Sequence, residues 1–141
     1  MSSREAIETL IVTYAELVDA GDFGGVGELL SRATFTGGTG PITGREAITQ
    51  YFYDALILYE DNTPRTRHIV TNFIVDLDKA AGTATCRSTF TAYQSLPDLP
   101  LQPIAIGRYN DTFTQSNSTW HFTTREVHVD LPGNLTHHLR P

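Results

Sequence analysis

The sequence is poor in three features that would each define a class of protein: cysteine, long apolar runs and clusters of basic residues. Cys86 is the only cysteine, so no disulfide can form within the chain, and a cysteine-based zinc site would lack its partners. Because Cys86 lies in a segment of alternating apolar and polar residues, we expect a small buried side chain there rather than a nucleophile.

Charged side chains make up only 18% of the chain, and the formal net charge is −6. No run of lysine or arginine occurs, so nucleic acid is not an expected partner. No apolar stretch is long enough to span a bilayer, and the first residues lack the basic and apolar regions of a signal peptide. We therefore expect no membrane contact and a cytoplasmic location.

What is present is an ordinary globular composition, with 40% hydrophobic residues in 141 positions, which predicts a single domain over residues 1–141. In the first part of the chain, apolar residues recur at spacings of three and four, a pattern typical of amphipathic helices. We expect three helices: from Ser3 to about Ala20, ended by Gly21; from Asp22, as its cap, to Leu30; and from Thr43, as its cap, to Leu56.

From Arg67 onward the pattern changes to alternation, which indicates strands. A short strand is also expected at 34–36, and the glycine-rich segment 37–41 is expected to be a loop. The proline-containing segment 95–103 is either a lid or an edge connection. Helices followed by antiparallel strands predict an α+β fold, a curved sheet with its helices on one face. The four long strands are expected at 68–77, 83–93, 104–114 and 120–130.

Asp19 and His68 are the leading candidates for chemistry. Asp19 lies where the first helix should end, a place where the helix dipole disfavours an anion, so a solvated helix end or a specific partner would explain it. His68 begins a strand in which alternation puts His68, Val70, Asn72 and Ile74 on one face, and both faces are expected to be covered. A core histidine bonded to a backbone carbonyl and a general acid/base both fit this position.

Tyr14 and Tyr51 lie on the apolar stripes of the first and third helices. Either hydroxyl could point into a cavity as a hydrogen-bond donor, or it could be the polar tip of a core residue. Metal use is not expected, since the remaining histidines show no ligand spacing, and His137 and His138 are expected to be a solvated pair in the tail. The last two strands should also bring Arg108, Asp111, Arg125 and Glu126 into an exposed cross-strand ion network.

Two blocks resemble a known family: Arg67-His68-x-Val70-Thr71-Asn72 and Gly107-Arg108-Tyr109-x-Asp111. With the order of the expected elements, they resemble the SnoaL-like branch of the nuclear transport factor 2-like superfamily. This branch is close to scytalone dehydratase and to the beta subunits of ring-hydroxylating dioxygenases. The resemblance runs from about Glu5 to Leu139.

The resemblance implies a cone, a strongly bent, mainly antiparallel sheet wrapped around three helices with a deep apolar pocket inside. It also implies a homodimer or larger assembly built through the sheet, and a hydrophobic small-molecule ligand. Asp19 and His68 match the dehydratase aspartate and histidine, of which the histidine is the acid/base. Two departures make scytalone itself an unsuitable substrate: Val18 replaces a tyrosine, and the segment 88–93 lacks the second histidine.

The sequence therefore predicts an enzyme without a cofactor that transfers protons on a hydrophobic, oxygenated small molecule, by dehydration, isomerisation or cyclisation. His68 would act as acid/base, Asp19 would orient it, and Tyr14 or Tyr51 would donate to a developing oxyanion. A module that binds a small molecule, or that is the partner subunit of an oxygenase, is the alternative, because this fold hosts both. The mainly polar strand face formed by Thr83, Thr85, Arg87, Thr89 and Thr91 favours a homodimer over an oxygenase partner.

Overall fold

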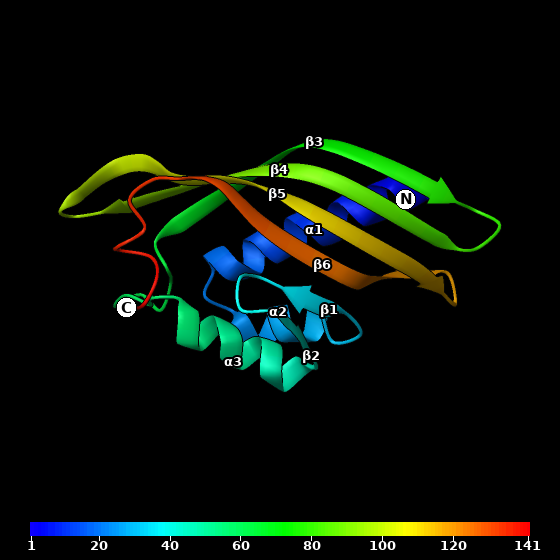
Figure 1. Ribbon diagram of the computed structural model, residues 1–141, viewed down its shortest axis with the longest axis horizontal. Helices are drawn as coiled ribbons and strands as arrows, with labels where there is room; N and C mark the ends of the chain where they lie inside the picture. Colours follow the sequence, from blue (N-terminus) through cyan, green and yellow to red (C-terminus); the bar gives the residue numbers. More distant parts are fainter.

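The computed structural model describes all 141 residues, with three helices on one side of a strongly curved six-stranded sheet (Figure 1). The strand order is β2-β1-β6-β5-β4-β3, and every pairing is antiparallel except the parallel pair β1–β6. The predicted α+β fold is confirmed. The elements are α1 (Ser3–Asp19), α2 (Phe23–Leu29), β1 (Thr34–Thr36), β2 (Pro41–Thr43), α3 (Arg45–Ala55), β3 (Thr66–Asp78), β4 (Thr83–Leu96), β5 (Leu99–Ser116) and β6 (Thr119–Pro132).

The ends of the helices follow from local capping. The Ser2 hydroxyl accepts a hydrogen bond from the Glu5 amide at 3.1 Å at the start of α1, and Asp22 accepts one from Gly25 at 2.9 Å at the start of α2. The prediction of Thr43 as the cap of α3 is wrong. Gly44 is the N-cap of α3, with a φ of 94°, and it offers no side-chain bond. At that φ a threonine would be strained, so the chain uses the glycine to turn into the helix.

The strands are longer than predicted, because turns occupy fewer residues than the sequence suggests. Pro41–Thr43, where the end of a loop and a helix cap were expected, pairs with β1 as β2. The segment 95–103 forms a connection between two strands, a hairpin in which β4 runs to Leu96 and β5 starts at Leu99. This hairpin projects beyond the body of the sheet (Figure 1). Pro103 lies at a register shift in the pairing of β5 with β4, the kind of irregularity at which a strand tolerates proline.

A bulge in β3 overturns the predicted division of its faces. The pairing with β4 shifts between Thr71 and Ile74, and Asn72 has a φ of 59°. One extra residue moves every later side chain to the other face. Val70 and Ile74, expected on the same face, therefore lie on opposite faces: Val70 packs against the core, whereas Ile74 points outward and is 47% exposed. The outer face is also uncovered in the single chain, contrary to the expectation that both faces are covered.

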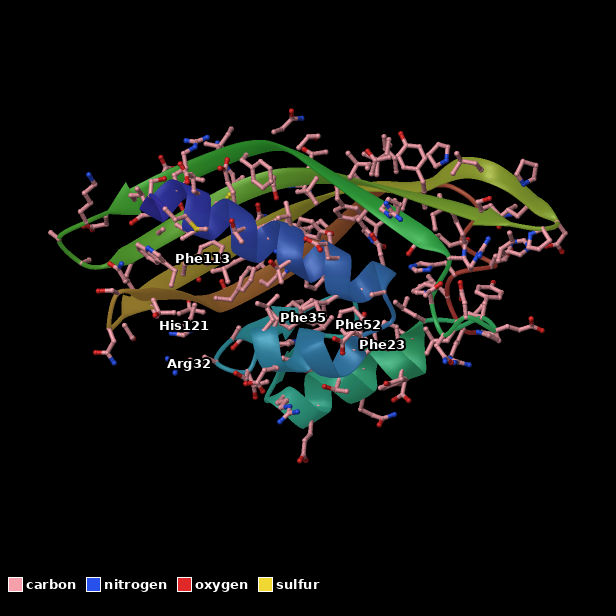
Figure 2. All side chains as sticks on the ribbon, turned by 180° about the vertical axis from the view of Figure 1, so that it is seen from behind. Phe23, Arg32, Phe35, Phe52, Phe113 and His121 are labelled. Atoms are coloured by element: carbon pink, nitrogen blue, oxygen red, sulfur yellow. The ribbon has the colours of Figure 1, made fainter.

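The core lies between the concave face of the sheet and the helices. Figure 2 shows Phe23, Phe35 and Phe52 gathered between α2, α3 and the sheet, with ring centroids of Phe23 and Phe35 5.7 and 5.5 Å from that of Phe52. Cys86 is buried in this core, as expected for a small hydrophobic residue. None of the helices is both long and apolar enough to cross a membrane.

Candidate functional site

An apolar cavity of about 130 Å³ lies between the concave face of the sheet, α1, α3 and the C-terminal segment. Hydrophobic residues provide 16 of its 19 lining positions, and Gly37, His68 and His138 provide the rest. Apart from the tyrosine hydroxyls, the two imidazoles are therefore the polar side chains of this lining. Tyr14 and Tyr51, both candidates from the sequence, also line the cavity.

The fold brings Asp19 and His68 into direct contact. His68 Nδ1 lies 2.6 Å from Asp19 Oδ1, and the His68 amide donates to Asp19 Oδ2 at 2.8 Å. The Thr66 hydroxyl adds a third hydrogen bond to Oδ1 at 2.9 Å. These donors explain how the carboxylate is held at the unfavourable end of α1. Since Asp19 engages Nδ1, Nε2 is the ring nitrogen that is left to meet a ligand.

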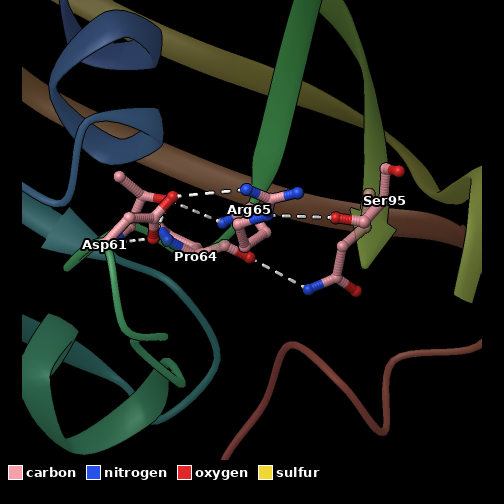
Figure 3. Close-up of polar contacts among 6 residues, drawn as sticks. Asp61, Pro64, Arg65 and Ser95 are labelled. Atoms are coloured by element: carbon pink, nitrogen blue, oxygen red, sulfur yellow. Dashed lines mark hydrogen bonds and ion pairs between the residues drawn. The ribbon is translucent and has the colours of Figure 1, made fainter. Parts of the chain in front are cut away.

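The loop before β3 is fixed by a network that sets the position of Thr66 and His68 (Figure 3). Arg65 contacts Asp61 at 3.4 Å and donates from Nε to the Ser95 carbonyl at 3.3 Å. The buried side chain of Gln94 donates to the Pro64 carbonyl at 3.0 Å. β3 begins two residues after Pro64. This network therefore fixes the start of the strand at the position where His68 contacts Asp19.

His138 was missed by sequence reasoning, which expected it in a solvated tail. Its side chain is buried, and the residue is only 8% exposed. The C-terminal segment runs back along α3, and the His138 carbonyl accepts from the Ile57 amide at 2.9 Å. Burial lowers the pKa of His138 to about 4, with a further contribution from the nearby His68. The only sequence signal was the apolar pair Leu135 and Leu139 on either side of it, which also line the cavity.

The two tyrosines differ in how free their hydroxyls are. The Tyr51 hydroxyl donates to the Gly37 carbonyl at 3.1 Å, so it is already engaged. Tyr14 is 5% exposed, and burial raises its pKa to about 12, partly offset by Arg125. The Tyr14 hydroxyl therefore stays protonated and neutral at physiological pH, so it can donate a hydrogen bond.

The predicted exposed network on β5 and β6 is instead two separate pairs. Arg108 pairs with Asp130 on the outside at 2.7 Å, whereas Arg125 pairs with Asp111 at 2.9 Å with both side chains fully buried. The Arg125 guanidinium lies between the rings of Tyr14 and Tyr109, 4.0 and 3.7 Å from their centroids. This stacking explains how the charge is tolerated behind the cavity wall.

The remaining histidines do not join the site. Figure 2 places His121 beside Arg32, at the end of the molecule away from the C-terminal segment, and His128 contacts Glu126 on the surface at 3.2 Å. No group of three or more histidine, cysteine, aspartate or glutamate side chains is arranged to hold a metal ion.

The model of the SnoaL-like domain family matches residues 1–126. The chain belongs to this family. No curated protein matches the chain. The family match ends inside β6, so the C-terminal segment that carries His138 lies outside it.

Solved structures show the same fold. A protein of unknown function with a cystatin-like fold from Nostoc punctiforme PCC 73102 has a TM-score of 0.77 at 21% identity, over 96% of this chain and 98% of that one. A protein provisionally named an aromatic ring hydroxylase, from Novosphingobium aromaticivorans, gives 0.72 at 24% identity, over 95% and 94%. Another from that organism, provisionally named a scytalone dehydratase, gives 0.69 at 20% identity, over 91% and 84%. At these identities the likeness establishes the fold.

Proposed function

We propose that this protein is an enzyme that needs no cofactor and transfers protons on a hydrophobic, oxygenated small molecule held in the apolar cavity. The observation that carries the proposal is the Asp19–His68 pair, with Nδ1 and Oδ1 2.6 Å apart and His68 lining the cavity. An imidazole oriented by a carboxylate and facing an apolar space is a general acid/base device. The provisional name of one structural neighbour, a scytalone dehydratase, is compatible with chemistry of this kind.

His68 is the acid/base in this proposal. Its Nε2 removes a proton from a carbon next to a carbonyl, or gives one to a departing hydroxyl, while Asp19 holds Nδ1–H and stabilises the imidazolium. In this proposal the neutral hydroxyl of Tyr14, which lines the cavity, donates to an oxygen on which negative charge develops. Tyr51 would have to exchange its bond to the Gly37 carbonyl for one to the ligand. Dehydration, isomerisation and cyclisation all use these steps.

The volume of the cavity limits the size of the substrate. An apolar cavity of roughly 150 Å³ accommodates a benzene ring, and this one measures about 130 Å³. The closed part of the site therefore suits one ring, and any larger molecule would extend through the mouth.

The test is exchange of hydrogen for deuterium next to the carbonyl of small cyclic ketones in D₂O, followed by NMR. We expect His68→Gln and Asp19→Asn to slow this exchange at least a hundredfold, within the range that a positioned acid/base contributes. The matched controls are His121→Gln and Asp76→Asn, which make the same changes away from the cavity. Equal rates in His68→Gln and wild type would exclude the proposed mechanism.

A binding module is the second candidate, favoured by the apolar lining and by the outer face of the sheet. Ile69, Ile74, Ile106 and Leu131 are exposed there, from 36% to 63%. We propose that a second copy of the chain covers this face as a homodimer. If ketones bind in the cavity but no variant changes any exchange or dehydration rate, a binding role replaces the enzyme.

A further inference from the structure

His138 lines the cavity together with His68, although it comes from a segment that lies beyond the family match. Its Nδ1 is buried and has no hydrogen-bond partner in the protein. A buried polar atom without a partner costs free energy, so native structures rarely keep one unless something else satisfies it. A bound molecule in the cavity would supply such a partner.

The backbone around His138 is held tightly, which makes its position a feature of the fold rather than of a loose tail. The amides of Ile57 and Arg140 donate to the carbonyls of His138 and Ala55, both at 2.9 Å. Gln94 donates to the His137 carbonyl at 3.0 Å. Because Gln94 also bonds to the Pro64 carbonyl, one buried amide joins the C-terminal segment to the loop that leads to His68.

His138 and His68 have different surroundings although they face one space. His68 has the Asp19 carboxylate on its Nδ1, whereas His138 has no carboxylate within hydrogen-bond reach. Burial keeps His138 uncharged at neutral pH, since its pKa is lowered to about 4. Its imidazole then has one N–H donor and one acceptor nitrogen, and the lowered pKa makes it a poor base, which suits it to hydrogen bonding rather than to proton transfer.

We infer that His138 is a ligand-binding residue that hydrogen-bonds the carbonyl oxygen of a one-ring hydrophobic ketone, while His68 faces the carbon to be deprotonated. The inference rests on the proposed function for the role of His68, but the hydrogen bond to the ligand oxygen can be measured without turnover. It also assigns the oxygen-binding role to an imidazole, in place of the engaged hydroxyl of Tyr51.

The experiment compares two probes of nearly the same shape, acetophenone and ethylbenzene, which differ by a carbonyl group in place of a methylene. Dissociation constants are measured by NMR titration on wild type, His138→Phe, and His137→Phe as the matched control on the neighbouring residue. His138→Phe is expected to weaken acetophenone binding three- to tenfold more than ethylbenzene binding, the effect of one neutral hydrogen bond. His137→Phe is expected to leave the ratio of the two constants unchanged.

Two further measurements separate hydrogen bonding from packing. In ¹⁵N-histidine-labelled wild type, acetophenone should shift the ring nitrogens of His138 and ethylbenzene should not. His138→Gln, which keeps an N–H donor, should restore part of the preference for the ketone. An equal loss of affinity for both probes in His138→Phe, no change for either, or no binding of acetophenone to wild type would each overturn the inference.

The proposed function is tested independently of the assignment of His138. Asp19→Asn should abolish deuterium exchange while it leaves the ratio of probe affinities intact. A normal ratio with unchanged exchange in Asp19→Asn would contradict the acid/base proposal and leave the assignment of His138 standing.

Discussion

At the scale of single residues, this protein buries several groups that can carry charge, and each is handled differently. Asp19 receives three hydrogen bonds, Arg125 receives a carboxylate and two aromatic rings, and His138 is held neutral. Burial penalises charge, so a buried group must either find a partner or give up its charge. These choices lead to two predictions about stability.

The first prediction concerns the dependence of stability on pH. The folded pKa of His138, about 4, lies below the ordinary value of 6.5, so the unfolded chain binds more protons between these values. The neutral His138 therefore makes its full contribution to the free energy of unfolding above about pH 6.5. This contribution is lost as the pH falls towards 4, and the loss is about 3 kcal/mol at most. Urea denaturation of wild type and His138→Phe at pH 7.5, 5.5 and 4.5 checks this.

We expect the difference in unfolding free energy between wild type and His138→Phe to change with pH in that window only. Comparison with the variant is needed because Asp111 acts in the opposite sense: burial raises its pKa to about 6, although Arg125 opposes the shift. A difference that stays constant from pH 7.5 to 4.5 would show that His138 is not held neutral.

The second prediction concerns the buried pair of Arg125 and Asp111. Arg125→Met leaves the carboxylate buried without a counter-charge and should lower the free energy of unfolding by about 3–5 kcal/mol. Adding Asp111→Leu should recover most of that loss, because no uncompensated charge then remains. Chemical denaturation measures both. Arg108→Met, on the exposed pair with Asp130, is the control and should have a far smaller effect.

At the scale of elements, the site depends on where α1 ends and how β3 begins. Gly21 ends α1 with a φ of 74°, and a Cβ at that position would lie 2.0 Å from the Asn62 carbonyl oxygen. The loop to β3 thus packs directly against the turn after Asp19. This packing joins the end of α1, which carries Asp19, to the loop that leads to His68.

Gly21→Ala tests this arrangement. It adds both the strain of a left-handed conformation and a backbone clash, so we expect a loss of more than ~2 kcal/mol in unfolding free energy. Gly82→Ala is a matched control, since φ there is 67° but the nearest atom to a Cβ is 3.9 Å away, and strain alone should cost roughly 1–2 kcal/mol. Thermal and urea denaturation of the two variants measure the difference in unfolding free energy. Equal losses in the two variants would show that the loop at Asn62 moves to accommodate the added Cβ.

At the scale of the whole molecule, the helices cover one face of the sheet and leave the other open (Figure 1). The open face combines apolar positions on β3, β5 and β6 with a polar row on β4. Ile106 and Leu131 lie opposite each other on neighbouring strands, so they form one apolar surface. Such a surface supports the proposed homodimer.

Ile106→Lys should weaken that dimer, because it buries a charge in the apolar surface between two copies. Sedimentation equilibrium is expected to show a dimer for wild type and a dissociation constant raised at least tenfold for the variant. Val12→Lys, which places the same charge on α1 at a similarly exposed residue, should leave association unchanged. A monomeric wild type would exclude the homodimer.

Much of the fold was predictable because its signals are local. The apolar spacing of α1, the capping by Ser2 and Asp22 and the alternation of the four long strands each depend on neighbours in the sequence. The bulge at Asn72 was not predictable, because a single inserted residue leaves the composition of β3 unchanged. Nor was the burial of Arg125: the sequence placed it near Asp111 on the neighbouring strand, but in an exposed network rather than under the helices.

The sequence by itself determined the fold class, the positions of the long elements and the two residues, Asp19 and His68, at the end of α1 and the start of β3. It did so because periodicity, caps and turns are set by residues a few positions apart. Only the tertiary structure decided that these two side chains touch, that His138 faces the same cavity and that Arg125 lies behind its wall. Those contacts join residues tens of positions apart, and only the curvature of the sheet and the path of the C-terminal segment bring them together.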